Sequence, residues 1–315
     1  MKKLYHICLT AHSEVLLRNI DDVRLMTNLP ALAAWRSGTD ILIDSRMSTH
    51  SHEIVSTEDP HGYACRQIIS ITKAYNSKYQ RSGRLFDSDP FILELSGPRH
   101  SQMAMCYSLR QGLHHAQSET PFDYQWSTCN HVFRESRGVP AVLPTLTSRS
   151  EIASALPKSS DFPDGWTADS EGILLRDSFE QIALVETWFG TPRNYMFSMI
   201  RKTSEEWLAE QSKDSNSAPI VDLNLLERGY TADDIRKMID NETNSKYRRG
   251  YGSRQYSDMQ ICEIIDNQML GRFKAASVYQ LDNSQKQSIA LELKYDFGVK
   301  SDPQIARCLA MNYLL

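Results

Sequence analysis

Residues 46–57, RMSTHSHEIVST, decide how the first part of the chain is interpreted. The HSHEIVST half reads as a β-strand and the preceding DILIDSRM reads as another, so the short connection predicts an antiparallel pair. Side chains alternate between the two faces of a strand, which places His50 and His52 on one face and Ser51 on the other. Two imidazoles on one face can share a cation, although two surface or hydrogen-bonded histidines would give the same pattern.

Helical and strand-like periodicities alternate on either side of this pair. Apolar residues three and four positions apart predict helices, and short runs rich in β-branched residues predict strands. The expected elements are a strand over 4–10, a helix over 21–37, strands over 40–47 and 50–57, a helix over 59–83, a strand within 84–96 and a helix over 98–117. Their order contains β-α-β-β-α-β, the ferredoxin-like or split βαβ arrangement.

Composition divides the rest of the chain. Residues 135–165 are rich in Ser, Pro, Thr and Gly, which is typical of a linker. Residues 166–315 read mostly as helices. The predicted fold class is therefore α+β, with a ferredoxin-like antiparallel sheet domain over 1–134, a linker over 135–165 and a mostly α-helical domain over 166–315.

The overall composition is that of an ordinary globular protein. Of 315 residues, 41% are hydrophobic and 23% are charged, and the net charge is −4. This balance does not indicate a nucleic-acid binder, although a local basic face would be sufficient. No apolar run approaches the roughly 20 residues that span a bilayer, and the six cysteines form no C-x-x-C pair. We expect a cytoplasmic protein with no membrane partner and no zinc finger.

The helix expected over 98–117 carries a second pair of interest. Tyr107 and Gln111 are four positions apart, so they lie one turn apart on one helix face. A glutamine carbonyl oxygen is a hard ligand suited to Mg²⁺ or Mn²⁺. Together with His50 and His52 it would complete a three-ligand site with Tyr107 beside the metal. The alternative for Tyr107 is an aromatic ring that packs on the sheet.

Five short motifs follow one another between residues 4 and 130. They are Tyr5-His6 in the first strand, MSTHSH at 47–52, YQRSGRLF at 79–86, YSLRQGLHHA at 107–116 and DYQWST at 123–128. In this order and spacing they resemble the single-tyrosine HUH transposases, and among these the REP-associated tyrosine transposases. The corresponding family motifs are YH, MPNHxH, G-x-L-F, YIxxNPVxxG and DYPWSS.

The resemblance implies an activity and a set of roles. It implies that His50, His52 and Gln111 bind Mg²⁺ or Mn²⁺ and that Tyr107 is the nucleophile. The implied activity is a metal-dependent single-stranded DNA endonuclease and strand transferase that forms a covalent 5′-phosphotyrosine and a free 3′-OH. Family members are often dimeric, so the resemblance also carries the expectation of a homodimer.

The sequence also departs from the family pattern. Ser51 replaces a bulky apolar residue between the histidines, Ser48-Thr49 replaces Pro-Asn, and Gly112 replaces a proline. These departures favour an alternative, a non-catalytic DNA-binding regulator derived from such an enzyme. A metallohydrolase that uses the same histidines without a covalent intermediate is a third hypothesis.

Two stretches interleave basic and aromatic residues, a pattern typical of grooves that bind single strands. The first offers Lys73, Tyr75, Lys78, Tyr79, Arg81 and Arg84, and the second offers Lys246, Arg248, Arg249 and Arg254. Either could instead be a solvated segment, and Tyr75 and Tyr79 are also rival nucleophiles.

Near the end of the chain, residues 285–312 read as helix, turn at Gly298, and helix. This spacing suits a helix-turn-helix whose second helix would enter a major groove. The expected partner is single-stranded DNA with hairpin or duplex ends.

Overall fold

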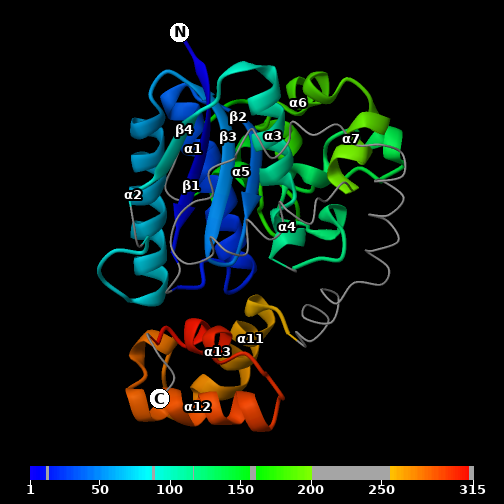
Figure 1. Cartoon of the computed structure of the whole chain (residues 1–315). Helices are drawn as coiled ribbons and strands as arrows, with labels where there is room; N and C mark the ends of the chain where they lie inside the picture. Colours follow the sequence, from blue (N-terminus) through cyan, green and yellow to red (C-terminus); the bar gives the residue numbers. More distant parts are fainter. Residues whose placement is uncertain (12–13, 87–88, 116, 157–160, 201–255, 312–315) are drawn as a thin grey trace, which may run out of the picture.

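The computed structural model describes residues 1–11, 14–86, 89–115, 117–156, 161–200 and 256–311 (Figure 1). The first part folds as β1 (Lys3–Thr10), α1 (Ile20–Ser37), β2 (Asp40–Arg46), β3 (His50–Thr57), α2 (Pro60–Tyr79), β4 (Phe91–Glu94) and α3 (Gly97–Leu109). The four strands form one antiparallel sheet in the order β2-β3-β1-β4. The predicted α+β class and element order are confirmed.

The remaining elements are shorter. The α-helices are α4 (Gln111–His114), α5 (Arg149–Ala155), α6 (Ile182–Phe189), α7 (Pro192–Ile200), α11 (Asp258–Ile264), α12 (Asn283–Tyr295) and α13 (Asp302–Cys308). Single 3₁₀ turns lie at Pro121–Asp123, Thr128–Asn130, Glu135–Arg137, Arg176–Ser178, Leu270–Phe273 and Val278–Gln280, and a π-turn at Ile265–Met269.

Strand alternation gives the sheet two different faces. Ile7 and Val55 pack with α1 and α2 in one hydrophobic core. Leu42 and Ile54 pack with α3, α6 and α7 in another. The sheet is therefore covered on both faces, and the histidines of β3 lie on the α3 side because they share the parity of Ile54.

The expected linker packs against the sheet domain. Ile152 of α5 and Leu156, which follows this helix, pack with Leu32 of α1 and with Trp166 in a small core of their own. Asn28 of α1 donates hydrogen bonds to the carbonyl oxygens of residues 155 and 172. Residues on both sides of the predicted boundary at 166 thus pack with the sheet domain, and the division into domains stays a prediction.

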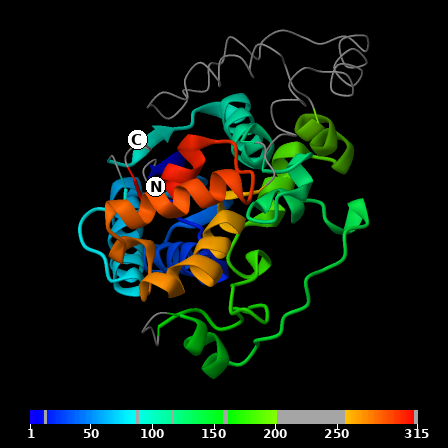
Figure 2. The same cartoon turned by 90° about the horizontal axis from the view of Figure 1, so that it is seen from below.

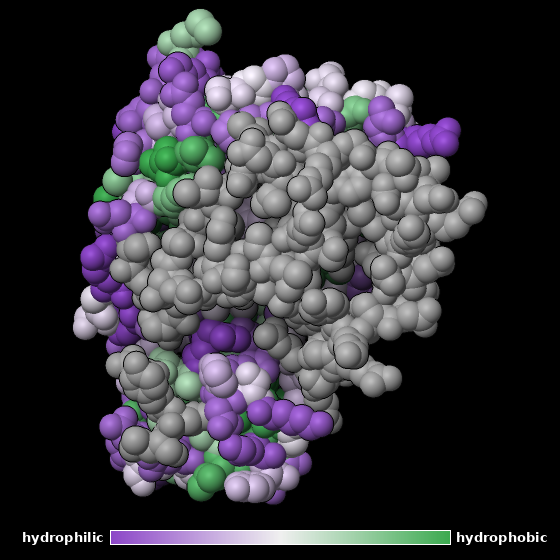
Figure 3. All heavy atoms as spheres, in the orientation of Figure 1, coloured by the Kyte–Doolittle hydropathy of each residue, from purple (hydrophilic) through white to green (hydrophobic). Residues whose placement is uncertain are grey.

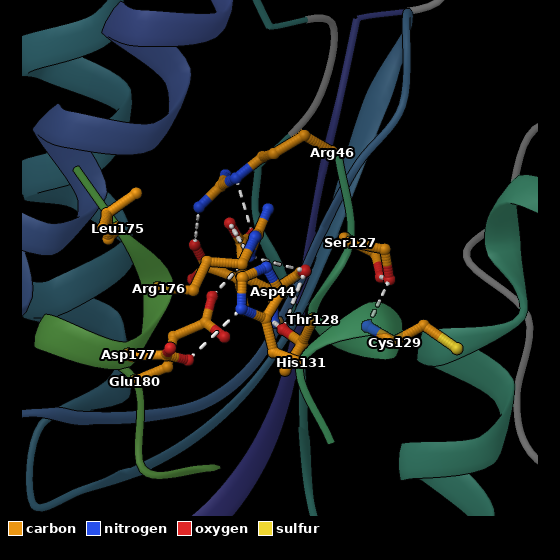
Figure 4. Close-up of polar contacts among 12 residues, drawn as sticks. Asp44, Arg46, Ser127, Thr128, Cys129, His131, Leu175, Arg176, Asp177 and Glu180 are labelled. Atoms are coloured by element: carbon orange, nitrogen blue, oxygen red, sulfur yellow. Dashed lines mark hydrogen bonds and ion pairs between the residues drawn. The ribbon is translucent and has the colours of Figure 1, made fainter. Parts of the chain in front are cut away.

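The outer edge of β2 is covered by Ser127 and Thr128 and by the stretch that contains Glu180 (Figure 4). Ser45 forms a bridge with Ser127, and Ile41 forms one with Glu180. Thr128 donates a hydrogen bond to the Asp44 carbonyl oxygen and accepts one from the Asp44 amide. Covering an edge strand in this way blocks pairing with other chains.

The C-terminal helices α11–α13 form a separate unit below the end of the sheet (Figures 1 and 2). Its core includes Ile261, Ile289 and Ile305 and reaches Val15 of the sheet domain. Arg18, 1% exposed, donates a hydrogen bond to the Cys308 carbonyl oxygen and pairs with Asp266. Hydrophilic residues cover much of this unit's described surface on the face drawn in Figure 3.

The predicted recognition helix, α13, packs one face into the C-terminal unit. Gln304, Ile305, Ala306 and Cys308 of α13 are buried, and Arg307 is paired with Asp258. The predicted helix, turn at Gly298 and second helix are present as α12, a positive-φ glycine and α13, and the use of α13 as a recognition helix stays a prediction. Among the described residues, no helix is long and apolar enough to cross a membrane.

Candidate active site

Three histidines gather on the α3 face of the sheet. The β1–β3 register pairs His6 with Ile54 and Cys8 with His52, so His6 and His52 are diagonal neighbours. Their Nε2 and Nδ1 atoms lie 3.0 Å apart, and their rings are stacked with centroids 5.2 Å apart. The His50 ring stands perpendicular to that of His52 at 5.1 Å. All three side chains are buried.

Tyr107 projects from α3 into this group. Its ring centroid lies 5.3 Å from that of His52 and 6.0 Å from that of His6. The helix packs on the same face of the sheet through Met105 and Leu109. Since Tyr107 itself is only partly buried, the phenol is both beside the imidazoles and reachable from outside.

Gln111 lies one turn further, across a break in the helix. The sequence predicted one helix over 98–117, but α3 ends at Leu109 and α4 begins at Gln111, with Arg110 at φ −92° and ψ 6° between them. The Gln111 side chain donates a hydrogen bond from Nε2 to the Tyr107 carbonyl oxygen, 3.2 Å away. Its Oε1 is buried and accepts no hydrogen bond from any described residue.

Gly112 has a steric reason to be glycine. A Cβ placed there would lie 2.4 Å from Cβ and Cγ of Tyr124, closer than any side chain tolerates. The Tyr124 hydroxyl donates a hydrogen bond to the carbonyl oxygen of Arg46, 2.5 Å away. This contact fastens α4 beside β2, so the departure at residue 112 is explained by packing and leaves the polar residue at 111 in place.

Sequence reasoning assigned no role to three further histidines. His6 was noted only as part of a motif, and His114 and His115 only inside the quoted stretch 107–116. The His114 ring lies 5.6 Å from that of Tyr107, and the His115 ring lies 4.6 Å from that of His50. The seven-residue spacing from Tyr107 to His114, two helical turns, was the available signal.

The environment favours neutral imidazoles. Burial lowers the pKa of His52 well below its usual value, and the neighbouring His50 and His6 add to this effect. Burial also lowers the pKa of His6 to about 4, with a smaller contribution from His100. Neutral imidazole is the form that binds a metal ion.

The donor set fits a divalent cation of the Mg²⁺ or Mn²⁺ class. Within the described ranges, no group of three or more His, Cys, Asp or Glu side chains is arranged to hold a metal ion. The expected set consists instead of two imidazoles, His50 and His52, and an amide oxygen, Gln111 Oε1. A buried amide oxygen without a hydrogen-bond donor costs free energy unless something else satisfies it, and a cation would do so.

Two tyrosine rings of the predicted stacking surface on α2 are buried in this structure. Tyr75 and Tyr79 are 1% and 7% exposed. Tyr75 donates a hydrogen bond to the Val15 carbonyl oxygen, and Tyr79 donates one to Asp22. Burial also raises the pKa of both phenols. These rings offer no face to a nucleic acid here, and burial likewise speaks against their role as nucleophiles.

The basic residues of this stretch divide into two groups. Lys78 pairs with Asp22, and Arg81 pairs with Glu14, so both charges are used inside the protein. Lys73 and Arg84 are exposed. The second predicted stretch, with Lys246, Arg248, Arg249 and Arg254, lies outside the described residues.

Comparisons with known proteins add only distant similarities. The chain matches no family model and no curated protein sequence. Among solved structures it is similar to a REP-associated tyrosine transposase bound to a REP hairpin, with 12% identity, a TM-score of 0.38, and coverage of 54% of this chain and 95% of that one. It is also similar to a putative transposase from Deinococcus radiodurans R1, with 14% identity, a TM-score of 0.26, and coverage of 33% and 88%. Similarities of this size do not establish a function.

Proposed function

We propose that the protein is a metal-dependent single-stranded DNA endonuclease and strand transferase with Tyr107 as its nucleophile. The observation that supports this most strongly is the position of the Tyr107 ring, 5.3 Å from the ring of His52 and one turn from the buried, unsatisfied Oε1 of Gln111. Few arrangements use a partly exposed phenol, neutral imidazoles and a free amide oxygen together.

His50, His52 and Gln111 would hold Mg²⁺ or Mn²⁺. When bound, the cation would polarise the scissile phosphate and stabilise the charge that develops on its oxygens. Because an ordinary tyrosine has a pKa near 10, the phenol is a weak nucleophile at neutral pH, and a site that favours its attack has to supply this stabilisation.

The chemical step exchanges one phosphodiester for another. The Tyr107 oxygen attacks phosphorus, and the bond from phosphorus to the 3′ oxygen breaks. The phenol loses its proton, for which the imidazole of His114 is a suitable acceptor, its ring 5.6 Å from that of Tyr107. The departing 3′ oxygen takes up a proton and becomes a 3′-OH. Since the 5′-phosphotyrosine link conserves bond energy, a 3′-OH can attack it and join strands.

The substrate we propose is the one that the sequence resemblance implies, single-stranded DNA with hairpin or duplex ends. A homodimer stays a prediction. The regulator hypothesis stays the alternative, and the packing of Gly112 against Tyr124 accounts for one of the departures that favour it.

The test is a covalent adduct assay. The protein is incubated with end-labelled single-stranded DNA and Mn²⁺, with and without chelator, and SDS-resistant adducts are separated. We expect an adduct with the wild type, none with Tyr107→Phe, and an unchanged adduct with Tyr295→Phe, which alters an exposed tyrosine on α12. An adduct from Tyr107→Phe would refute the nucleophile.

The rival functions give different results in the same assay. A non-catalytic regulator would bind the DNA without cutting it, and Mn²⁺ would make no difference. A metallohydrolase would cut the DNA in a chelator-sensitive way while leaving no protein on either end, and Tyr107→Phe would then cut normally.

A further inference from the structure

His6 lies outside the proposed ligand set but is fully buried against it. It is 0% exposed, and its ring contacts three others: His52, Tyr107 at 6.0 Å and Phe91 at 6.1 Å between centroids. An aromatic hydrocarbon of similar size would pack among these rings without the cost of burying two polar nitrogens. The imidazole therefore needs a reason other than packing.

The only hydrogen bond of the His6 ring among the described residues joins its Nε2 to Nδ1 of His52, 3.0 Å away, and its own Nδ1 has no partner there. Two neutral imidazoles can share one such bond in two ways. If His52 donates from Nδ1, its Nε2 carries a lone pair. If His6 donates from Nε2, His52 must carry its proton on Nε2, and that nitrogen is then closed to a cation.

Only the first arrangement is compatible with His52 as a ligand, because the hydrogen bond at one ring nitrogen decides which nitrogen binds the metal. A second imidazole is a sufficient acceptor for this purpose. Unlike a carboxylate in the same position, an imidazole carries no negative charge in either of its common protonation states, so it adds none beside the phosphate of the substrate.

We propose that His6 is a positioning residue, which accepts the Nδ1 proton of His52 and so holds the His52 ring with Nε2 open to a divalent cation beside Tyr107. This inference rests on the proposed function. The stacking of the two rings, with 24° between their planes, fixes the orientation of His52 as well as its tautomer.

The tautomer is measured first, without metal and without DNA. ¹⁵N-resolved NMR of the histidine rings in the full-length protein distinguishes protonated from unprotonated nitrogens, and His52→Gln identifies the His52 signals. We expect His52 to carry its proton on Nδ1. A proton on Nε2 of His52 would overturn the inference, whether or not the protein cleaves DNA.

The variants then test the coupling. His6→Phe keeps an aromatic ring but removes the acceptor, and His6→Gln restores an acceptor. We expect Mn²⁺ affinity, followed by calorimetry and by EPR of the free ion, to fall about 10- to 100-fold in His6→Phe and to recover partly in His6→Gln. The exposed His61 supplies the control, His61→Gln, which should bind Mn²⁺ like the wild type.

These outcomes separate the inference from the proposed function. Unchanged Mn²⁺ affinity in a folded His6→Phe would refute the positioning role while leaving the nuclease proposal intact. A wild type with Nδ1-protonated His52 that binds no Mn²⁺ would refute the metal site instead. If His6→Phe does not fold, the wild-type tautomer and the His6→Gln affinity still decide the question.

Discussion

The two faces of the same strands carry buried polar clusters of opposite kinds. On the α3 face, His52 lies beside the imidazoles of His50 and His6, and Gln111, one turn after Tyr107, has a buried side-chain oxygen with no described donor. On the other face, Arg46 forms ion pairs with Asp44 and Glu53. Because β-strand side chains alternate, β3 contributes to both clusters within four residues. The charged side chains on one face are paired with one another, whereas the face with the histidines has a polar atom without a described partner.

The charged cluster extends beyond the sheet (Figure 4). Arg176 pairs with Asp44 and Glu180 and ties the segment after α5 to the edge of β2. Gln67 of α2 donates a hydrogen bond to Glu53. Nearly every group there has a partner of opposite charge, which is the pattern of a structural network.

The largest effect on stability is expected at Arg46, in the charged cluster. Arg46→Ala leaves the buried Glu53 without its cation and Asp44 with Arg176 alone, so we expect the free energy of unfolding to fall by about 3–5 kcal/mol. Chemical denaturation followed by circular dichroism measures this loss. Arg84→Ala, which removes an exposed arginine paired with Asp89, is the control and should change little. A loss below about 1 kcal/mol at Arg46 would mean that the cluster is not structural.

A substitution at Gly112 tests the packing on the α3 face of the sheet, where the histidines lie. Gly112→Ala forces a methyl group onto Tyr124, and we expect it to cost about 1–3 kcal/mol of stability through overpacking. The same substitution should also lower adduct formation, since α4 carries Gln111 and His114. Gly271→Ala is the matched control, because a Cβ there meets no atom within 4 Å. Equal stability of the two variants would contradict the close approach.

The charged face should also respond to pH. Burial raises the pKa of Glu180 to about 7 against the pull of Arg176, above its unfolded value of 4.5. The folded state therefore holds this proton more tightly, and its stabilising effect is complete below pH 4.5 and is lost as the pH rises to about 7.

We expect Glu180→Gln to remove this dependence. The difference in unfolding free energy between the wild type and Glu180→Gln should fall by on the order of 1–3 kcal/mol from pH 4.5 to 7.5. Denaturation curves at several pH values measure it, with the exposed Glu135→Gln as control. A difference that rises with pH would reverse the assigned direction of the shift.

The smallest effects should come from α2. Lys73 is exposed, so Lys73→Ala should weaken single-stranded DNA binding a few-fold and reduce the salt slope by roughly 0.7. Tyr75→Phe should leave DNA binding unchanged and cost about 1 kcal/mol of stability, because it removes the hydrogen bond to the Val15 carbonyl oxygen. Anisotropy titrations and thermal unfolding separate the two. Reversed effects would return Tyr75 to the surface role that the sequence predicted.

The strands and the first helices could be predicted because their signals are local. Asn19 caps α1, and Gly38 ends it with φ 62°, as their positions before and after the apolar pattern indicate. The placement of both histidines on one strand face likewise follows from alternation alone. Local rules suffice wherever neighbouring residues determine the backbone.

The sequence predictions differ from the structure where contacts with residues far away in the sequence determine the local environment. Tyr75 contacts Tyr279, and Arg81 also lies over that ring, 5.4 Å from its centroid, so a partner 200 positions away turned an apparent DNA surface into an interface. The helix break at Arg110 accompanies the packing of Gly112 against Tyr124. No window of sequence around either position contains that information.

A hydrogen bond between the turn before β3 and the C-terminal unit limits how the chain can be divided. The Ser48 hydroxyl, in the turn between β2 and β3, donates a hydrogen bond to Asp258, 2.7 Å away, and Arg307 and Gln304 hold the same carboxylate. The C-terminal helices are thus hydrogen-bonded to the turn at Ser48, two residues before His50. Exchanging or removing this unit would therefore remove a contact that holds the turn before the strand that carries the histidines, so the strand and the C-terminal helices have to be kept together.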